Sequence, residues 1–461
     1  MKIYTPMRTA PIALITLTML LGACGTRDSD DDLAFESGIG TDTGTGTDTG
    51  TGTGTGTGTD TGTGTDTGTG TDTGTGTDTG TGTGNPPLTG ESTQTDFGFV
   101  FTRDTGFETG QIERISLTDG NIVNGTYPPV ESDYIVVTDG EALFQIGRFN
   151  IDNITRFSPT DTSIIDYQIS VREEGAPTTN LVGMAFVDSD LAYLTQRRSD
   201  KLLIIDPTPE EQTAEALITG EISLAAYNRG SDDALDFGDM TDALVVGNRL
   251  FVLLENLDGF TPINRGYLVV IDTITGLEIE TGQGEFPLKG IQLQTRNPTS
   301  LQYDEDSGLL YVVGRGDSFA DESVTVDTYT GGIESIDPDT YQSNLLIDDG
   351  TENENNGYFS SGVVINESLG YLITLEGENN SINNLRSFNP QTGELSDPIA
   401  GTEGQSLTTL AVGPDNHLWV GIQNLTSGEF MRVDLATGLP VSDRVATNLI
   451  PSNIVFITTS E

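Results

Sequence analysis

Carboxylate side chains gather in two segments of the chain, and clustered carboxylates are groups that bind hard cations. The first group lies within eight residues and consists of Asp232, Asp233, Asp236 and Asp239. The second lies within residues 314–331 and includes Asp317, Asp321 and Glu322. The first group could ligate calcium through its carboxylate oxygens. A solvated acidic loop is the commoner role of such a sequence. We treat both groups as parts of a candidate acidic binding rim.

Other residue types that perform catalysis are scarce. The chain contains one histidine, His417, and one cysteine, Cys24. This composition excludes a zinc-finger site and covalent haem attachment. We expect His417 in a turn on the face opposite the rim, where it is a poor general base. The sequence therefore identifies no cofactor, and any bound metal would be a calcium-like divalent cation with oxygen ligands.

The charge balance limits the possible partners. Residues 96–461 contain 58 acidic and 17 basic residues, a net charge of −41. Such a field repels phosphate backbones and anionic head groups, and it favours cations or basic protein surfaces. Nucleic acid is therefore excluded as a natural partner. Solubility in a salty medium accounts for most of this charge.

The N-terminus has the pattern of an export signal. Lys2 and Arg8 precede an apolar stretch over residues 10–21, which is too short to span a bilayer. The next residues, Leu21-Gly22-Ala23-Cys24, resemble the lipobox of bacterial lipoproteins. The resemblance implies cleavage before Cys24, a lipid on its thiol, and attachment to the membrane by acyl chains. The alternative is a soluble secretory signal with an incidental cysteine. Gly25, where an aspartate would retain the protein at the inner membrane, implies the outer membrane of the bacterial cell envelope.

A low-complexity repeat follows. From residue 41 to residue 84 every odd position is Thr and every even position is Gly or Asp. Such a segment has no apolar side chains with which to offset its conformational entropy by burial. We therefore predict a disordered, flexible tether over residues 24–95.

Seven aromatic residues recur at spacings of 45, 49, 58, 60, 60 and 48, each within a short apolar run: Phe99, Phe144, Tyr193, Phe251, Tyr311, Tyr371 and Trp419. A second apolar run follows each and ends in a turn-forming residue: Ser116, Ser158, Asp206, Asp272, Asp337, Asn389 and Asp434. A period of roughly 40 to 60 residues built from short strands and turns is typical of the blades of a β-propeller. The sequence predicts an all-β, seven-bladed propeller over residues 96–461, with strands a to d in each blade.

The two ends of this region are complementary. The first unit begins with its strand b at about Phe97, whereas the chain ends in an unpaired strand over residues 453–458. We expect the last strand to close the first blade and thereby remove an open sheet edge. Leu310-Tyr-Val-Val and Asp434-Leu-Ala-Thr-Gly438 resemble the bacterial YVTN and NHL-like propeller repeats. The resemblance covers the propeller and implies its fold, while these folds host many functions.

Polar residues recur where the strands a begin, near the predicted channel mouth. Four of them could act as ligands: Asp133, Asn180, Asp242 and Asn453. In lactonase-like propellers, which this chain resembles in architecture, acidic and Asn side chains near the channel hold a catalytic divalent cation. These four residues would be the counterparts. The simpler interpretation is that polar residues start strands because they form turns.

Long connections between strands b and c and between d and a fall on one predicted face, mainly in blades 4 to 6. They include residues 229–239, 281–297, 314–331 and 376–384. Long loops on one rim of a rigid scaffold are a common place for binding. We therefore favour a non-catalytic module that binds a protein or envelope component through the acidic rim. The alternative is a metal-dependent, lactonase-like hydrolase at the channel mouth.

The anchor assignment leads to a test. Because Cys24 is the only thiol in the chain, Cys24→Ser should abolish lipid attachment and release a soluble protein from the membrane fraction. Fractionation of cells followed by intact-mass measurement of the mature chain checks this. A wild-type mature chain without acyl groups would contradict the assignment.

Overall fold

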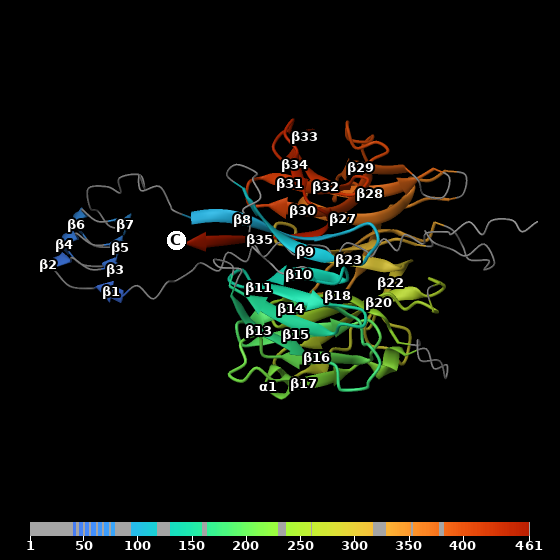
Figure 1. Cartoon of the computed structure of the whole chain (residues 1–461), viewed down its shortest axis with the longest axis horizontal. Coiled ribbons are helices and arrows are strands. Elements are labelled where there is room, and N and C mark those ends of the chain that lie inside the picture. The colour runs from blue at the N-terminus through green and yellow to red at the C-terminus, as the bar shows by residue number, and fades with distance from the viewer. Residues whose placement is uncertain are drawn as a thin grey trace, which may run out of the picture. The chain divides into compact units, whose positions relative to one another are not determined.

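Strands make up nearly all the regular structure of the chain, as the computed structural model in Figure 1 shows. The described residues are seven short strands between residues 40 and 78, and then 94–117, 130–158, 164–228, 237–259, 261–316, 329–351, 354–377 and 382–460. They fall into two compact units, one containing Phe97–Ile457 and one containing Asp28–Asp96 with Thr458–Glu461. Among these residues there is no helix of the length and apolarity needed to span a membrane.

The larger unit is a seven-bladed β-propeller. In blades 2, 3, 5 and 6 the antiparallel strands pair in chain order. Blade 1 consists of β35 (Ile450–Ser460), β8 (Gln94–Arg103) and β9 (Gly110–Ser116). Blade 2 consists of β10 (Tyr134–Thr138), β11 (Leu143–Gly147), β12 (Asn153–Phe157) and β13 (Ile165–Ser170). Blade 3 consists of β14 (Leu181–Asp188), β15 (Leu191–Gln196), β16 (Lys201–Ile205) and β17 (Ile218–Ser223), and two short helices flank its last strand, α1 (Ala214–Leu217) and η1 (Ala225–Tyr227).

The remaining blades follow the same plan. Blade 4 consists of β18 (Met240–Val246), β19 (Arg249–Leu254), β20 (Arg265–Asp272), β21 (Leu277–Glu278) and β22 (Ile291–Arg296). Blade 5 consists of β23 (Pro298–Asp304), β24 (Leu309–Gly314), β25 (Gly332–Ile336) and β26 (Ser343–Asp348). Blade 6 consists of β27 (Tyr358–Asn366), β28 (Leu369–Glu376) and β29 (Ile382–Phe388). Blade 7 consists of β30 (Ser406–Gly413), β31 (His417–Gln423), β32 (Gly428–Asp434), β33 (Leu439–Pro440) and β34 (Val445–Thr447).

The first strands of adjacent blades contact one another from β10 to β30, so strands a line the axis of the ring. The recurring aromatic residues all lie in strands b, as predicted, and none is more than 4% exposed. Seven apolar clusters of described residues form the core of the propeller, and each contains side chains from two neighbouring blades. For example, Trp419 and Phe430 of blade 7 pack with Val100 and Ile115 of blade 1. Each blade is therefore stabilised by burying its faces against its neighbours.

The turns that follow strands c use the predicted residues. The Asp272 carboxylate accepts hydrogen bonds from the backbone N–H groups of Ile274 and Thr275 at 3.0 and 2.7 Å. Asp337, Asn389 and Asp434 accept equivalent bonds in blades 5, 6 and 7. These backbone hydrogen bonds lower the pKa of the Asp272 carboxyl below its usual value. The turn prediction is confirmed in these four blades, where the short polar side chain mimics a backbone turn.

The last strand closes the ring, as predicted. β35 lies beside β8 in one sheet (Figure 1), and its Asn453 side chain bonds both backbone groups of Val136 in blade 2, at 3.0 and 2.7 Å. Glu113 of β9 fastens the other side. Its carboxylate accepts the backbone N–H groups of Asn448 and Leu449, which follow blade 7, and the Thr102 hydroxyl. Blade 1 is thus tied to both neighbours.

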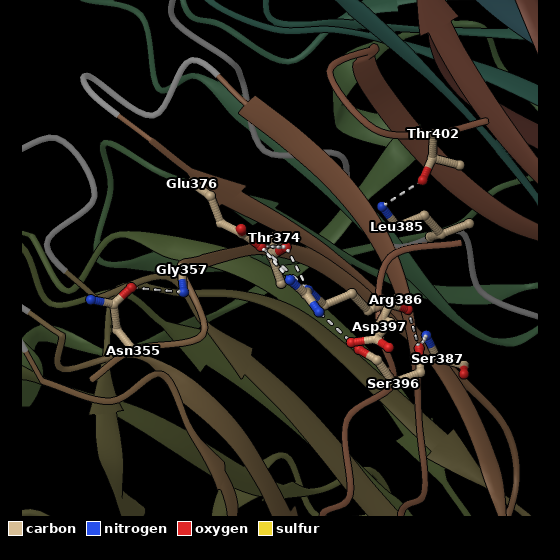
Figure 2. Close-up of polar contacts among 10 residues, drawn as sticks. All are labelled: Asn355, Gly357, Thr374, Glu376, Leu385, Arg386, Ser387, Ser396, Asp397 and Thr402. Atoms are coloured by element: carbon tan, nitrogen blue, oxygen red, sulfur yellow. Dashed lines mark hydrogen bonds and ion pairs between the residues drawn. The ribbon is translucent and has the colours of Figure 1, made fainter. Parts of the chain in front are cut away.

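Among the described residues, blade 1 has three strands, and the fourth strand departs from the simple pattern in blades 4, 6 and 7. In blades 4 and 7 it is divided in two, because β21 and β22 both pair with β20, and β33 and β34 both pair with β32. Residues 281–297, expected as a rim loop, therefore contain a sheet strand. In blade 6 an irregular segment takes the fourth position. Figure 2 shows its Ser396 and Thr402 side chains accepting the N–H groups of Ser387 and Leu385 in β29, at 2.9 and 3.2 Å.

The repeat region contains seven short strands. Its strands are β1 (Gly40–Asp42), β2 (Gly46–Asp48), β3 (Thr51–Gly54), β4 (Thr57–Asp60), β5 (Thr63–Asp66), β6 (Thr69–Asp72) and β7 (Thr75–Asp78). They form two parallel sheets in which Thr51 is in register with Thr63, and Thr63 with Thr75. The paired strands of each sheet are twelve residues apart along the chain. That this region is a flexible tether stays a prediction.

Ring closure can be tested at Glu113. Glu113→Gln leaves a carbonyl and an amide nitrogen facing several donors, so buried N–H groups lose their acceptor, at a cost of about 1–3 kcal/mol in unfolding free energy. Urea denaturation checks this, with the exposed Glu367→Gln as the matched control. Equal midpoints for the two variants would mean that Glu113 does not hold the closure.

Candidate binding face

The residue that directly follows strand b is charged in four adjacent blades, at the same end of the ring. Arg148, Arg197, Glu255 and Arg315 directly follow strands b of blades 2, 3, 4 and 5. The backbone N–H of each donates to the residue preceding strand a of its own blade. These bonds run from Arg148 to Asp133, Arg197 to Asn180, Glu255 to Asp239 and Arg315 to Asn297, at 2.9, 2.9, 3.0 and 2.9 Å. The same device therefore places a charged residue at this position in four adjacent blades; Arg197 is partly exposed, and the other three are buried. We call this end of the ring the b-end face.

The residues that accept these bonds have an unusual backbone. Asn180, Asp239 and Asn297 have φ values of 54°, 56° and 51°, in the left-handed region. Asn and Asp tolerate this conformation better than other non-glycine residues, because their short polar side chains bond locally. The left-handed backbone therefore explains why Asn or Asp occurs at these three positions. They turn the chain sharply into strand a next to the axis.

Three of the charged residues interact across blade boundaries. The Arg197 guanidinium forms an ion pair with the Glu255 carboxylate of the next blade. Burial lowers the pKa of Arg315 to about 10, attraction from Glu255 opposes this shift, and repulsion from Arg197 adds to it. The pKa of Arg315 therefore depends on both Glu255 and Arg197. We call Arg197, Glu255 and Arg315 the charge cluster.

In blade 6 the negative charge of Glu376 is compensated by an arginine of the same blade, Arg386. Figure 2 shows Glu376, the last residue of β28, accepting hydrogen bonds from Arg386 and Thr374. The Arg386 Nη2–Glu376 Oε1 distance is 2.9 Å. Burial raises the pKa of Glu376, but the bonds from Arg386, Asn384 and Thr374 outweigh it and leave the pKa lowered. Here the arginine and the glutamate come from adjacent strands of one sheet, unlike the charge cluster.

The candidate rim is described at one residue. Asp239 lies at the start of β18, is 7% exposed, and its Oδ2 accepts the N–H of Leu257 at 3.1 Å. It holds the connection between strands b and c of blade 4. Six other rim candidates lie outside the described residues: Asp232, Asp233, Asp236, Asp317, Asp321 and Glu322. Cys24 also lies outside them.

The four channel-mouth candidates do not occupy equivalent positions. Asp133 and Asn180 directly precede strands a, whereas Asp242 and Asn453 lie inside β18 and β35. Asp242 Oδ2 accepts the N–H of Leu301 in blade 5 at 3.0 Å, and Asn453 bonds Val136 in blade 2. Both therefore link neighbouring strands a. Within the described ranges, no three His, Cys, Asp or Glu side chains are grouped so that they could hold a metal ion.

The sequence contained a signal for the charged positions that we did not use. Each of four residues follows its blade's recurring aromatic by four positions, and this set is Arg148, Arg197, Glu255 and Arg315. In a strand, residues four apart share a face, so a fixed offset from a core residue marks a fixed place in every blade. Arg103 and Gln423 have the same offset in blades 1 and 7.

Comparisons with known proteins support the fold. The chain is similar to a proposed 6-phosphogluconolactonase from Bacteroides fragilis, at 12% identity and a TM-score of 0.52, over 81% of this chain and 100% of that one. A second proposed 6-phosphogluconolactonase, from Bacteroides uniformis, matches at 11% identity and a TM-score of 0.51, over 79% and 99%. Identities this low show the propeller fold alone. No protein-family model and no curated protein sequence matches the chain.

A buried carboxyl group lies beside the b-end face of blade 5. Asp349 directly follows β26, is fully buried, and its Oδ2 accepts the N–H of Gly331 at 3.0 Å. Its Oδ1 is buried without a hydrogen-bond partner. Burial raises the pKa of Asp349 to about 7, against the lowering effect of the Gly331 bond. The ionised form is thus disfavoured in the folded protein.

This pKa predicts a pH-dependent stability. The folded pKa lies above the unfolded value of about 4, so stability falls as pH rises through that window and stays low above it. Asp349→Asn removes this loss. Relative to wild type, the variant should gain up to about 4 kcal/mol of unfolding free energy between pH 4 and pH 8. Urea denaturation at both pH values checks this, with the exposed Asp306→Asn as control. A difference between Asp349→Asn and wild type that is the same at both pH values would contradict the prediction.

Proposed function

We propose that this chain is a lipid-anchored, non-catalytic binding module of the bacterial cell envelope, attached to the outer membrane through Cys24. The propeller is displayed beyond the repeat region and binds a protein or envelope component through its b-end face. The YVTN/NHL-like character of the repeats is part of this proposal. So is the assignment of the acidic loops on that face as the rim that meets the partner.

The observation that carries the proposal is the repeated device at the b-end face. Four adjacent blades place a charged residue at this end, and the backbone of each is fixed by the same hydrogen bond to the residue before strand a. Binding residues on a rigid scaffold lose little conformational freedom when a partner arrives. The connections that extend from this end are also where the chain carries its long acidic segments. An acidic rim attracts a basic partner surface.

The described residues favour binding over lactone hydrolysis. Asp242 already accepts backbone N–H groups with both carboxylate oxygens, from Ala243 at 2.8 Å and from Leu301 at 3.0 Å. The Asn453 amide is engaged by Val136 through both its oxygen and its nitrogen. Two of the four candidate ligands thus act in holding the blades together, and a cation would compete with those bonds.

The rim can be tested by removing charge from the acidic segment that precedes Asp239. The triple variant Asp232→Asn, Asp233→Asn, Asp236→Asn should lose at least ten-fold in affinity for the component that co-purifies with the wild-type mature chain from envelope extract. Asp239 is left intact because it is buried and holds Leu257. Added salt should slow association more than it changes dissociation, since rim charges mainly set the association rate.

The matched control neutralises three exposed acids at the opposite end of the blades: Glu305→Gln, Asp306→Asn and Glu367→Gln. These residues lie on turns between strands a and b. The control variant removes the same number of charges as the rim variant. Binding kinetics measured for wild type and both triple variants separate a local effect from a change in net charge. Loss of binding in the control variant, with full binding by the rim variant, would mean that the binding face is the opposite end of the ring. That result would contradict the assignment.

A further inference from the structure

Two phenylalanine side chains are exposed on the b-end face of blades 1 and 2. Phe107, on the connection between β8 and β9, is 37% exposed, and Phe149, on the connection between β11 and β12, is 40% exposed. Two consecutive residues contact both of them. The Ser132 hydroxyl donates to the Phe107 carbonyl at 2.6 Å, and Asp133 Oδ2 accepts the N–H of Phe149 at 3.1 Å. The two exposed phenylalanines are therefore neighbours on this face, and exposed apolar groups that lie together mark interaction sites.

An arginine lies over each of these rings. The guanidinium carbon of Arg103 is 4.0 Å from the centre of the Phe107 ring. That of Arg198, which comes from blade 3, is 4.8 Å from the centre of the Phe149 ring. A cation over an aromatic face is attracted by the ring, and the attraction strengthens when water is excluded. We call Arg103, Phe107, Phe149 and Arg198 the aromatic patch, which extends over three adjacent blades.

The two arginines of the patch have no ion-pair partner among the residues that the structure describes, whereas Arg249 pairs with Asp339. Arg103 donates to the backbone carbonyl of Asp104 at 3.3 Å. The Asp104 carboxylate itself accepts three backbone N–H groups of its own loop. Arg198 is partly exposed, and its guanidinium contacts the Phe149 ring. A propeller with a net charge of −41 thus presents two unpaired cations beside exposed rings.

The backbone that carries the rings is held in place. Phe107 has a φ of 57°, which is unusual for a bulky residue, and Asn150, next to Phe149, has a φ of 65°. Such conformations persist only where the surrounding structure fixes them. Ser132 fixes the first, and the Thr178 hydroxyl fixes the second by accepting the Asn150 N–H at 2.9 Å. The patch therefore loses little conformational freedom when it is covered.

The composition of the patch indicates the chemistry of its occupant. The cores of protein–protein interfaces are enriched in aromatic residues and arginine. A neutral glycan would cover the rings but leave the two cations without counter-charge. A protein segment with carboxylates beside apolar side chains supplies both contacts. The rest of the propeller is acidic and favours basic surfaces, so a partner that carries both kinds of surface docks in one orientation.

We propose that the aromatic patch binds an apolar segment of a partner protein that carries carboxylates, with Phe107 and Phe149 packing on its apolar side chains and Arg103 and Arg198 pairing with its carboxylates. This inference rests on the proposed function and deepens it, because it names the chemistry of the partner segment that the b-end face takes up.

Fluorescence anisotropy of a dye-labelled synthetic peptide tests the proposal with the purified mature chain. The peptide has two Phe residues flanked by Glu, and a matched peptide has Gln in place of each Glu. The Glu peptide should bind about ten-fold more tightly than the Gln peptide. Phe149→Ser and Phe107→Asn should each weaken binding of the Glu peptide about ten-fold. Asn is chosen at position 107 because it tolerates the left-handed backbone.

Arg198→Gln provides a readout that a merely structural role would not change. It should reduce the difference in affinity between the Glu and Gln peptides, because it removes one of the cations that recognise carboxylates. Phe286→Ser, which removes an exposed phenylalanine between β21 and β22, and Arg249→Gln, which removes a paired arginine, are the matched controls and should leave both affinities unchanged. If Phe107→Asn fails to fold, Phe149→Ser and Arg198→Gln decide the outcome.

Several results would overturn the inference. The Glu peptide does not bind the wild-type chain, or Phe286→Ser weakens its binding as much as Phe149→Ser does. Binding of chitohexaose in place of the peptide, lost in Phe149→Ser, would identify a glycan-binding surface. A wild-type dimer in sedimentation velocity that Phe149→Ser converts to a monomer would mean that a second copy of the chain covers the patch.

The inference and the proposed function fail separately. If the Glu peptide does not bind but an envelope component still co-purifies in a manner that depends on the rim, the proposed function stands without the patch. Conversely, peptide binding that depends on Phe149 and Arg198, with no co-purifying component, would support the patch and contradict the envelope partner.

Discussion

Closure of the ring is the constraint on which the rest of the molecule depends. Each of the seven apolar clusters is shared between two blades, and the cluster of blades 7 and 1 forms only when the ends of the domain meet. β35 supplies the strand that blade 1 lacks, and Glu113 and Asn453 tie that blade to its neighbours on either side. Closure pairs the inner edge of β8, which would otherwise be open, and it fixes the distance between equivalent positions of adjacent blades. The charge cluster exists because of that fixed distance.

Many of the acidic and amide side chains serve this construction. Glu334 in β25 accepts the backbone N–H groups of Gln294 and Thr295 from the preceding blade, in the same manner as Glu113 in blade 1. Gln302 bonds both backbone groups of Val364 in the next blade, as Asn453 does with Val136. The large negative charge of the propeller is thus partly structural. An acidic residue near the axis is not by itself evidence of a ligand.

The recurring features of the fold could be read from the sequence because each blade repeats them. The aromatic of strand b and the turn residue after strand c lie where the sequence predicted them, as Tyr311 in β24 and Asp337 directly after β25 show. The first residues of strands a were harder to predict, because bulges such as the one between Met240 and Asp242 shift the strand starts. That shift placed Asp242 in the candidate ring and Asp239 in the rim. The charge cluster was missed because its members lie about 60 residues apart and meet only through the packing of blades.

Site-specific photo-crosslinking in cells tests the central claim that the b-end face is the binding face. A photoreactive residue at Ile263, which is exposed on the connection between β19 and β20, samples that face. One at the exposed Asp306, between β23 and β24, samples the opposite end. The account predicts a discrete adduct with an envelope component from position 263 and none from position 306. An adduct formed from position 306 alone would contradict it.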